Sequence, residues 1–222
     1  MTQSTTVTIA PAALARQADS HRIGRGPRRS DALSPAGGEP LSRFQVPDEA
    51  ELAPELRQVY SEFVEAYGFV PNWLRALSVN PDTAVRLVQF YHHLFDPARS
   101  RLSATERELL AVVTSAANRC SYCVFNHTRA LGAALEDDVR ARRIALDYHH
   151  VRLSKREQVL ADVAEKLTTQ PTSVGPAELE LLRQAGFDEA AALEVLEISA
   201  FFNYANRLTI ALNVVPDQQF FD

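Results

Sequence analysis

Apolar residues recur at helical spacing through most of the chain after residue 42. Between Pro54 and Tyr67 they form one stripe, which Gly68 ends: Leu56, Val59, Tyr60, Phe63 and Val64. Pro71 and Pro81 stand where further helices are expected to begin, because proline is favoured at the first position of a helix. The same spacing predicts later helices near 104–117, 121–134, 136–148, 154–168, 177–185 and 188–211. No segment shows the sustained alternation of a half-buried strand, so we predict an all-α fold.

Two segments begin in the same way, which indicates an internal repeat. Ser103 and Glu106 have the spacing of a capping box, in which the Ser hydroxyl bonds a backbone N–H at the helix start and the Glu side chain reaches back. The segment Leu102–Glu106 is matched by Leu153–Glu157, and an apolar helix follows each. We therefore expect a helical bundle of two similar units. The first unit alone contains cysteines, so we assign the chemistry to it.

Residues 1–41 differ from the rest of the chain. They are rich in Pro, Gly, Ser and Arg and show no apolar periodicity. Such a segment buries too little apolar surface to offset the entropy that it loses on ordering. We predict a flexible N-terminal arm at 1–41, which could become ordered against a neighbouring subunit, and one helical domain at 42–222.

The overall composition excludes several classes of protein. The chain has 23 Lys and Arg against 28 Asp and Glu, so it lacks the basic footprint of a nucleic-acid-binding protein. No stretch approaches the roughly 18–20 apolar residues of a membrane helix, and the N-terminus is a poor signal peptide. We therefore expect a cytoplasmic protein. Structural disulfides are rare in that compartment, so the two cysteines, three positions apart, suggest redox or metal chemistry.

Cys120, Cys123 and His127 lie in one predicted helix. A rotation of about 100° per residue places them on one face, with the two cysteines close enough for a disulfide and His127 one turn beyond Cys123. The predicted break at Asn118–Arg119 puts the cysteines at a helix N-terminus, where the pKa of a thiol falls. His127 could then accept a proton from Cys123, and Glu108 on the preceding helix could orient the imidazole.

The cysteine pair has two other interpretations. Small buried thiols are common core residues, and His127 could be an unrelated surface histidine. Alternatively, both cysteines, His127 and Glu108 could bind zinc. Structural zinc sites usually draw a second ligand pair from a distant segment, and the chain has no third cysteine and no HxxxH. The doublets His92–His93 and His149–His150 offer no substitute, because adjacent helical residues point about 100° apart.

The pattern of Glu108, eleven residues, Cys120-x-x-Cys123, three residues and His127 resembles a known family motif. It is the core motif of the alkylhydroperoxidase D-like (AhpD-like) proteins of the carboxymuconolactone decarboxylase-like superfamily. The resemblance is greatest to the subgroup called peroxidase-related enzymes. It extends to Gly68–Trp73 and Phe201–Arg207 and covers residues 42–218.

This resemblance implies an AhpD-like all-helical fold, homo-oligomers of three or more subunits, and hydroperoxide reduction without haem, metal or other cofactor. By analogy, Cys123 attacks the peroxide to give a sulfenic acid, and Cys120 resolves it as an intramolecular disulfide. His127 and Glu108 form the proton relay, through a water molecule. An external dithiol or a lipoyl group on a partner protein then reduces the disulfide.

The chain departs from the best-known members at Tyr122, where they have a second histidine between the cysteines. A tyrosine can donate a hydrogen bond but is a poor base near pH 7. Tyr122, Asn203 and Asn206 are further candidates for residues that line the substrate pocket. The decarboxylase branch of the family lacks the cysteine pair, which argues against lactone decarboxylation.

The resulting hypothesis is a peroxiredoxin-type antioxidant enzyme, a thiol-dependent hydroperoxide reductase. Two alternatives remain open. The first is a general thiol–disulfide oxidoreductase or redox sensor that meets peroxide only incidentally. The second is a non-enzymatic oligomeric protein in which the motif is vestigial.

Overall fold

The structure of the protein is a computed structural model that describes residues 40–220. Nearly all of the predicted arm at 1–41 therefore lies outside the described residues. The described part of the chain contains helices and no strand, which confirms the all-α prediction. Its α-helices are α2 (Pro54–Tyr67), α3 (Asn72–Leu77), α4 (Pro81–Phe95), α5 (Ala104–Ala117), α6 (Ser121–Leu135), α7 (Asp138–Asp147), α8 (Lys155–Thr169), α9 (Pro176–Gln184) and α10 (Glu189–Leu212).

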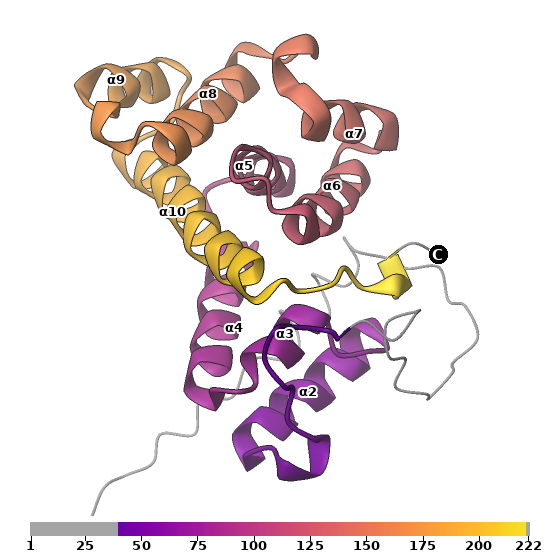
Figure 1. Cartoon of the computed structure of the whole chain (residues 1–222). Coiled ribbons are helices and arrows are strands. Elements are labelled where there is room, and N and C mark those ends of the chain that lie inside the picture. Colours follow the sequence, from indigo (N-terminus) through magenta and orange to yellow (C-terminus); the bar gives the residue numbers. More distant parts are fainter. Residues whose placement is uncertain (1–39, 221–222) are drawn as a thin grey trace, which may run out of the picture.

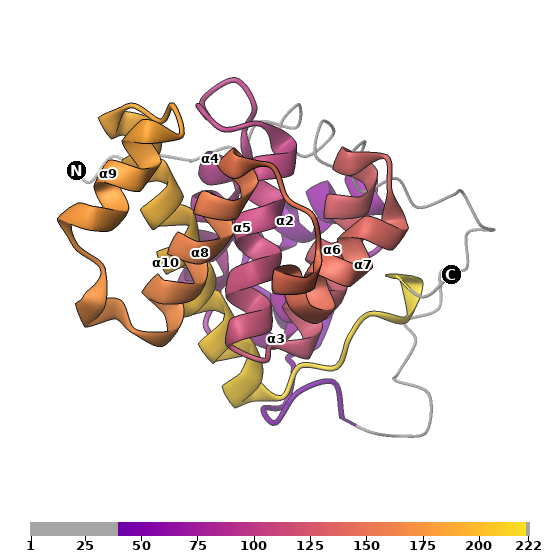
Figure 2. The same ribbon diagram turned by 90° about the horizontal axis from the view of Figure 1, so that it is seen from above.

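Helix α5 is the centre of the bundle (Figures 1 and 2). It packs against α6 and α7 on one side and against α8 and α10 on the other. Nine of its residues are buried, from Arg107 to Ser115, because neighbours surround it and leave no solvent-facing stripe in that stretch. The main hydrophobic core lies around it and includes Leu110, Leu131, Leu160 and Phe202.

Helices α2, α3 and α4 form a smaller layer beside this bundle (Figure 1). Leu56, Tyr60 and Phe63 of α2 pack against Ala84 and Val88 of α4 in a second hydrophobic cluster. Helix α4 also contacts α10, and so joins the layer to the main bundle. The predicted stripe on α2 is thus confirmed as its buried face, apart from Val64, which is exposed.

The two predicted capping boxes are present at the starts of their helices. Ser103 and Glu106 form a complete capping box at the start of α5, and Ser154 and Glu157 form another at the start of α8. Each box satisfies two backbone N–H groups that would otherwise lack partners at a helix start. The two helices that these boxes begin pack against each other, in keeping with two similar units.

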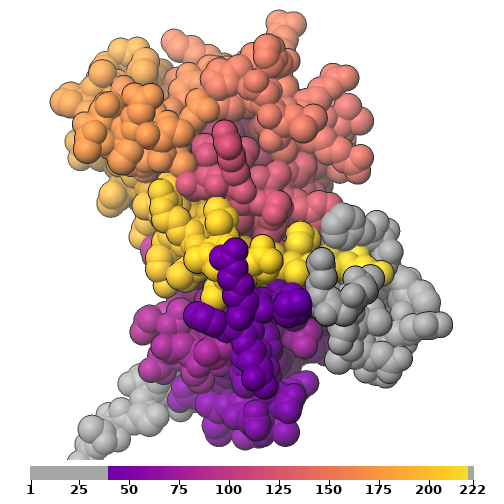
Figure 3. All heavy atoms as spheres, in the orientation of Figure 1, coloured from indigo at the N-terminus to yellow at the C-terminus, as the bar shows by residue number. Residues whose placement is uncertain are grey.

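The chain after α10 crosses between the bundle and the α2–α4 layer (Figures 1 and 3). Backbone hydrogen bonds tie it to the first described residues: Arg43 N–H donates to Leu212 O at 2.8 Å, and Val215 N–H donates to Leu41 O at 3.1 Å. The segment ends against α3, where Asp217 is almost wholly buried. No helix in residues 40–220 has the length and apolar character that crossing a membrane requires.

Candidate active site

The junction between α5 and α6 places the two cysteines. Asn118 ends α5, Arg119 takes a left-handed backbone conformation with φ of 58°, and Cys120 becomes the residue that precedes the first turn of α6. The Cys120 N–H donates to Ser115 O at 2.9 Å, which fixes the turn. The predicted break at Asn118–Arg119 is therefore confirmed, and both cysteines lie in or beside the first turn of a helix.

Cys120 and Cys123 are both free thiols, with 1% and 7% of their surface exposed. A hydrogen bond from the Cys123 thiol and further bonds from the backbone N–H groups of Cys123 and Tyr122 lower the pKa of Cys120, against the effect of burial. The same thiol–thiol bond, followed by burial, raises the pKa of Cys123 well above its usual range. Of the two sulfurs, Cys120 is the one that receives backbone N–H groups of the first turn of α6, and these favour its thiolate.

His127 lies one turn beyond Cys123 and is held by a buried carboxylate. Its Nδ1 is 2.8 Å from Glu108 Oε2, and both side chains are largely buried. An ionised carboxylate only accepts hydrogen bonds, so Nδ1 carries the proton in this pair and Nε2 is left as an acceptor when the ring is neutral. The ring packs edge-on against Phe202, with centroids 4.6 Å apart, which limits its rotation.

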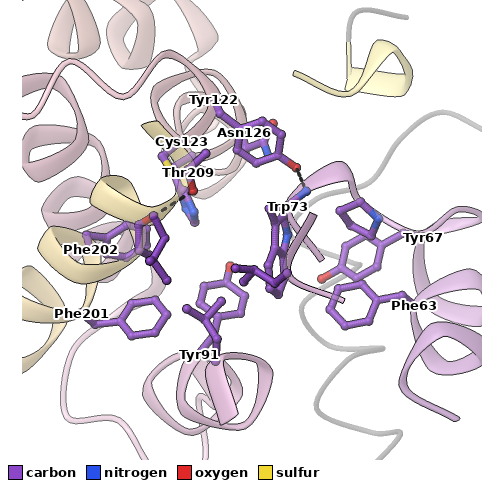
Figure 4. Close-up of a pocket in the computed structure, with 16 residues that line it drawn as sticks. Phe63, Tyr67, Trp73, Tyr91, Tyr122, Cys123, Asn126, Phe201, Phe202 and Thr209 are labelled. Carbon is purple, nitrogen blue, oxygen red and sulfur yellow. Dashed lines mark hydrogen bonds between the residues drawn. The ribbon is translucent and has the colours of Figure 1, made fainter. Parts of the chain in front are cut away.

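Cys123 and His127 open onto one cavity at the meeting point of α2, α3, α4, α6 and α10 (Figure 4). Seven of its sixteen lining residues are aromatic: Phe63, Tyr67, Trp73, Tyr91, Tyr122, Phe201 and Phe202. Among the described residues, no Asp, Glu, Lys or Arg side chain lines this cavity. Burial, followed by the nearby charge of Glu108, raises the pKa of Tyr67 and Tyr91, so both phenols stay neutral.

A family model of the carboxymuconolactone decarboxylase family matches residues 81–166, which span α4 to α8. A solved structure from Ralstonia eutropha JMP134, described as an alkylhydroperoxidase AhpD core and an uncharacterised peroxidase-related protein, is 32% identical. The match covers 82% of this chain and 96% of that one, with a TM-score of 0.77. The chain belongs to the AhpD-like carboxymuconolactone decarboxylase family.

Further comparisons place this AhpD-like chain among its relatives. An uncharacterised peroxidase-related protein from Silicibacter sp. TM1040 is 28% identical, with a TM-score of 0.77 over 84% of this chain and 97% of that one. The debrominase Bmp8 is 19% identical, with a TM-score of 0.67 over 81% and 93% of the two chains, and shares the fold. No curated protein sequence matched the chain.

Tyr122, the residue at which this AhpD-like chain departs from the best-known members, lines the cavity as expected. Its hydroxyl donates a short hydrogen bond to Asp217 Oδ2 in the C-terminal segment. The backbone N–H of Trp73 approaches the same hydroxyl at 3.4 Å (Figure 4). Burial raises the pKa of Asp217 to about 6, although the hydrogen bonds from Tyr122 and Asn72 act in the opposite direction. Tyr122 therefore joins the C-terminal segment and α3 to α6.

The expectation that Asn203 and Asn206 line the pocket is corrected, because neither is part of the cavity wall. Asn206 is fully buried behind the cysteines, where its amide hydrogen-bonds both thiols and its Nδ2 donates to Ser115 Oγ at 3.1 Å. Asn203 lies about one turn earlier in α10 and donates to Thr168 Oγ1 at 3.0 Å, and the Oδ1 atoms of both asparagines accept from Asn118 Nδ2 at 3.0 Å. Both face the interior of the bundle because α10 packs on α5 and α8 with that side.

Sequence reasoning missed several residues of the site. Thr209 lies on the cavity wall and hydrogen-bonds the Cys123 thiol, and Trp73 lines the opposite side. Asn126 stands directly before His127 in the motif, where its position could have drawn notice. No pattern in the sequence marked Asp217 as a site residue, because it lies in a segment without apolar periodicity.

The residues proposed above as zinc ligands do not assemble into a metal site. Within residues 40–220, no group of three or more His, Cys, Asp or Glu side chains is placed to hold a metal ion. His92 is buried among aromatic rings, and both of its ring nitrogens lack hydrogen-bond partners among the described residues. His149 instead bonds Asp147 at the surface.

Proposed function

We propose that this protein is a thiol-dependent hydroperoxide reductase of the peroxiredoxin type. The observation that carries the proposal is the shared cavity: Cys123 and His127 open onto the same aromatic pocket, and His127 is bonded to the buried Glu108. A nucleophile, a base and an orienting carboxylate are the parts that an activated thiol requires. The apolar wall suits a neutral organic hydroperoxide.

The first step oxidises Cys123. His127, through a water molecule, takes the proton of the Cys123 thiol, and Glu108 stabilises the imidazolium that forms. The Cys123 sulfur then attacks the terminal oxygen of the hydroperoxide, so that an S–O bond forms and the O–O bond breaks. The leaving alkoxide recovers the proton from His127. The products are an alcohol and a Cys123 sulfenic acid.

The second step uses Cys120. The Cys123 thiol, the largest cause of the lowered pKa of Cys120, is consumed in the first step. The backbone N–H groups of Cys123 and Tyr122 still bond the Cys120 sulfur and favour its attack on the sulfenic acid as a thiolate. The S–S bond forms, and the hydroxide that leaves is protonated to water. An external dithiol, proposed to be a lipoyl group on a partner protein, reduces the disulfide, so that no bound cofactor is required. We also propose assembly into a homo-oligomer, which light scattering can measure.

Hydroperoxide consumption with dithiothreitol as reductant tests the function. Cys123→Ser should abolish turnover. Without dithiothreitol, Cys120→Ser should reduce one equivalent of hydroperoxide and leave a sulfenic acid that dimedone traps. If the wild type and Cys123→Ser consume hydroperoxide at equal rates, the proposal fails.

The lowered pKa of Cys120 would also suit a general thiol–disulfide oxidoreductase. Against it, Cys120 is 1% exposed and does not line the cavity, so a protein disulfide cannot reach its sulfur without a change of conformation. The ratio of rate constants for cumene hydroperoxide and for a protein disulfide separates the two activities. A non-enzymatic protein would show neither reaction.

A further inference from the structure

Asn126 leaves a buried hydrogen-bond acceptor at the wall of the cavity. The side chain is 9% exposed and lies beside Cys123 and His127, and its Oδ1 has no hydrogen-bond partner among the described residues. Buried polar atoms are almost always hydrogen-bonded in native proteins. An unpartnered acceptor next to a reactive thiol therefore indicates a donor on the bound ligand.

The chemistry of Tyr122 decides which atom of the Asn126 amide bonds the Tyr122 hydroxyl. A tyrosine hydroxyl has one proton, and Tyr122 donates it to the carboxylate of Asp217. The Tyr122 oxygen can then only accept, and it accepts from Trp73 N–H and from the Asn126 amide. Asn126 must present its NH₂ group to Tyr122. Its Oδ1 consequently turns away from Tyr122 and is left without a hydrogen-bond partner among the described residues.

Asp217 sets the direction of this chain of hydrogen bonds. Its Oδ1 accepts the Asn72 N–H at 2.8 Å, and its Oδ2 accepts the proton of Tyr122. The carboxylate can only accept, so every donor in the chain points toward it. The order of donation is Asn126 to Tyr122 to Asp217, from the cavity toward the C-terminal segment.

We propose that Asn126 Oδ1 accepts the O–H of the hydroperoxide and thereby holds its terminal oxygen against Cys123. This inference rests on the proposed function. A hydroperoxide has one donor, and that donor sits on the oxygen that the sulfur attacks. Asn126 is then a substrate-binding residue, and Tyr122 and Asp217 are positioning residues that act through it. Tyr122 thus takes a different role from the histidine that the best-known relatives have there.

Two rate constants test the proposal in single-turnover reactions of the fully reduced protein. Cumene hydroperoxide carries the O–H donor, whereas methyl methanethiosulfonate reacts with the same sulfur and has no donor. Asn126→Leu keeps nearly the same volume and removes the acceptor. We expect its rate constant with cumene hydroperoxide to fall about tenfold or more, as for the loss of a buried hydrogen bond, and that with the thiosulfonate to stay unchanged.

A second variant reverses the chain of hydrogen bonds without touching the cavity. In Asp217→Asn, the new amide must keep its oxygen toward the Asn72 N–H and so turns its NH₂ toward Tyr122. Tyr122 then donates to Asn126, whose amide flips and presents NH₂ to the substrate. We expect the cumene hydroperoxide rate constant to fall and the thiosulfonate rate constant to hold. Tyr148→Phe is the matched control, because it removes a hydroxyl bonded to Asp162 and Glu165 on another face.

The outcomes separate the two proposals. If the wild type reacts with cumene hydroperoxide and Asn126→Leu reacts equally fast, the role of Asn126 is refuted and the proposed function stands. If both rate constants fall together, Asn126 acts on the thiol and not on the substrate, which also refutes its role. If the wild type does not react at all, the proposed function fails and the inference fails with it. Should Asn126→Leu not fold, the same two rate constants of Asp217→Asn decide.

Discussion

His127 Nδ1 lies 2.8 Å from Glu108 Oε2, so a histidine of α6 is paired with a carboxylate of α5 inside the bundle. The pair joins two helices that pack along their length, and Glu108 is almost completely buried. A buried carboxylate beside an imidazole stabilises the protonated ring when the ring accepts a proton. Substitutions in this pair therefore test the proposed chemistry most directly.

Replacing Glu108 by glutamine should slow hydroperoxide reduction. Glu108→Gln keeps an acceptor for His127 Nδ1 but removes the negative charge that stabilises the imidazolium. We expect kcat/KM for cumene hydroperoxide to fall about a hundredfold, which is typical for the loss of general-base catalysis. Glu197→Gln, an exposed change on α10, is the control and should leave the rate unchanged. An unaltered rate in Glu108→Gln would mean that the pair serves packing alone.

The Cys123 thiol should control the ionisation of Cys120. Its hydrogen bond is the largest cause of the lowered pKa of Cys120. Cys123→Ala removes this donor and should raise the pKa of Cys120, whereas Cys123→Ser keeps a donor and should raise it less. The ultraviolet absorbance of the thiolate, followed against pH, measures both. Equal pKa values in the two variants would show that the backbone N–H groups suffice.

His92 should make the protein sensitive to acid. Burial lowers its pKa from 6.5 to about 4, and neither ring nitrogen has a hydrogen-bond partner within residues 40–220. The unfolded chain therefore takes up a proton at a higher pH than the folded protein does, so stability is full above pH 6.5 and falls as the pH drops toward about 4. The loss is on the order of 3 kcal/mol.

His92→Leu should reduce the loss of stability between pH 6.5 and about pH 4, because it removes the group that titrates. Urea unfolding between pH 7 and pH 4 measures the free energy of unfolding of both proteins. The neighbouring His93→Gln is the control. His93 is exposed, so this substitution should leave the pH dependence of the free energy of unfolding unchanged. If the free energy of unfolding of His92→Leu falls with pH as steeply as that of the wild type, other groups cause the acid sensitivity.

Gly132→Ala should destabilise the protein, although alanine normally favours a helix. Gly132 lies in α6, where alanine would stabilise an isolated helix by up to about 1 kcal/mol. Here a Cβ would overlap Asp138 Oδ1 and lie 3.2 Å from Asp138 Cα at the start of α7. We expect Gly132→Ala to destabilise the protein by about 1–3 kcal/mol, as overpacking does.

Thermal or urea unfolding measures the effect of Gly132→Ala. Gly175→Ala is the matched control, because no heavy atom lies within 4 Å of its Cβ position. It should change the stability by less than about 1 kcal/mol. A Gly132→Ala protein at least as stable as the wild type would show that α7 can shift at no cost.

The sequence by itself determined the helices and the core of the motif. Proline, glycine and capping boxes act within a few residues, so helix ends such as those at Pro54, Gly68 and Ser103 could be predicted from local geometry. The spacing of Cys120, Cys123 and His127 depends only on the helical period. The pairing of His127 with Glu108 could be anticipated because the fixed spacing of the motif spans one helix junction.

Only the tertiary structure decided what surrounds that motif. Asp217 and Tyr122 are 95 positions apart, and their hydrogen bond exists because the C-terminal segment crosses between two helical layers. The cavity combines side chains from several helices, and Asn206 turned out to lie behind the cysteines. Such contacts depend on how whole helices pack, which no short-range pattern encodes. For the same reason, only the tertiary structure shows that Asn126 Oδ1 lacks a hydrogen-bond partner in the described part of the chain.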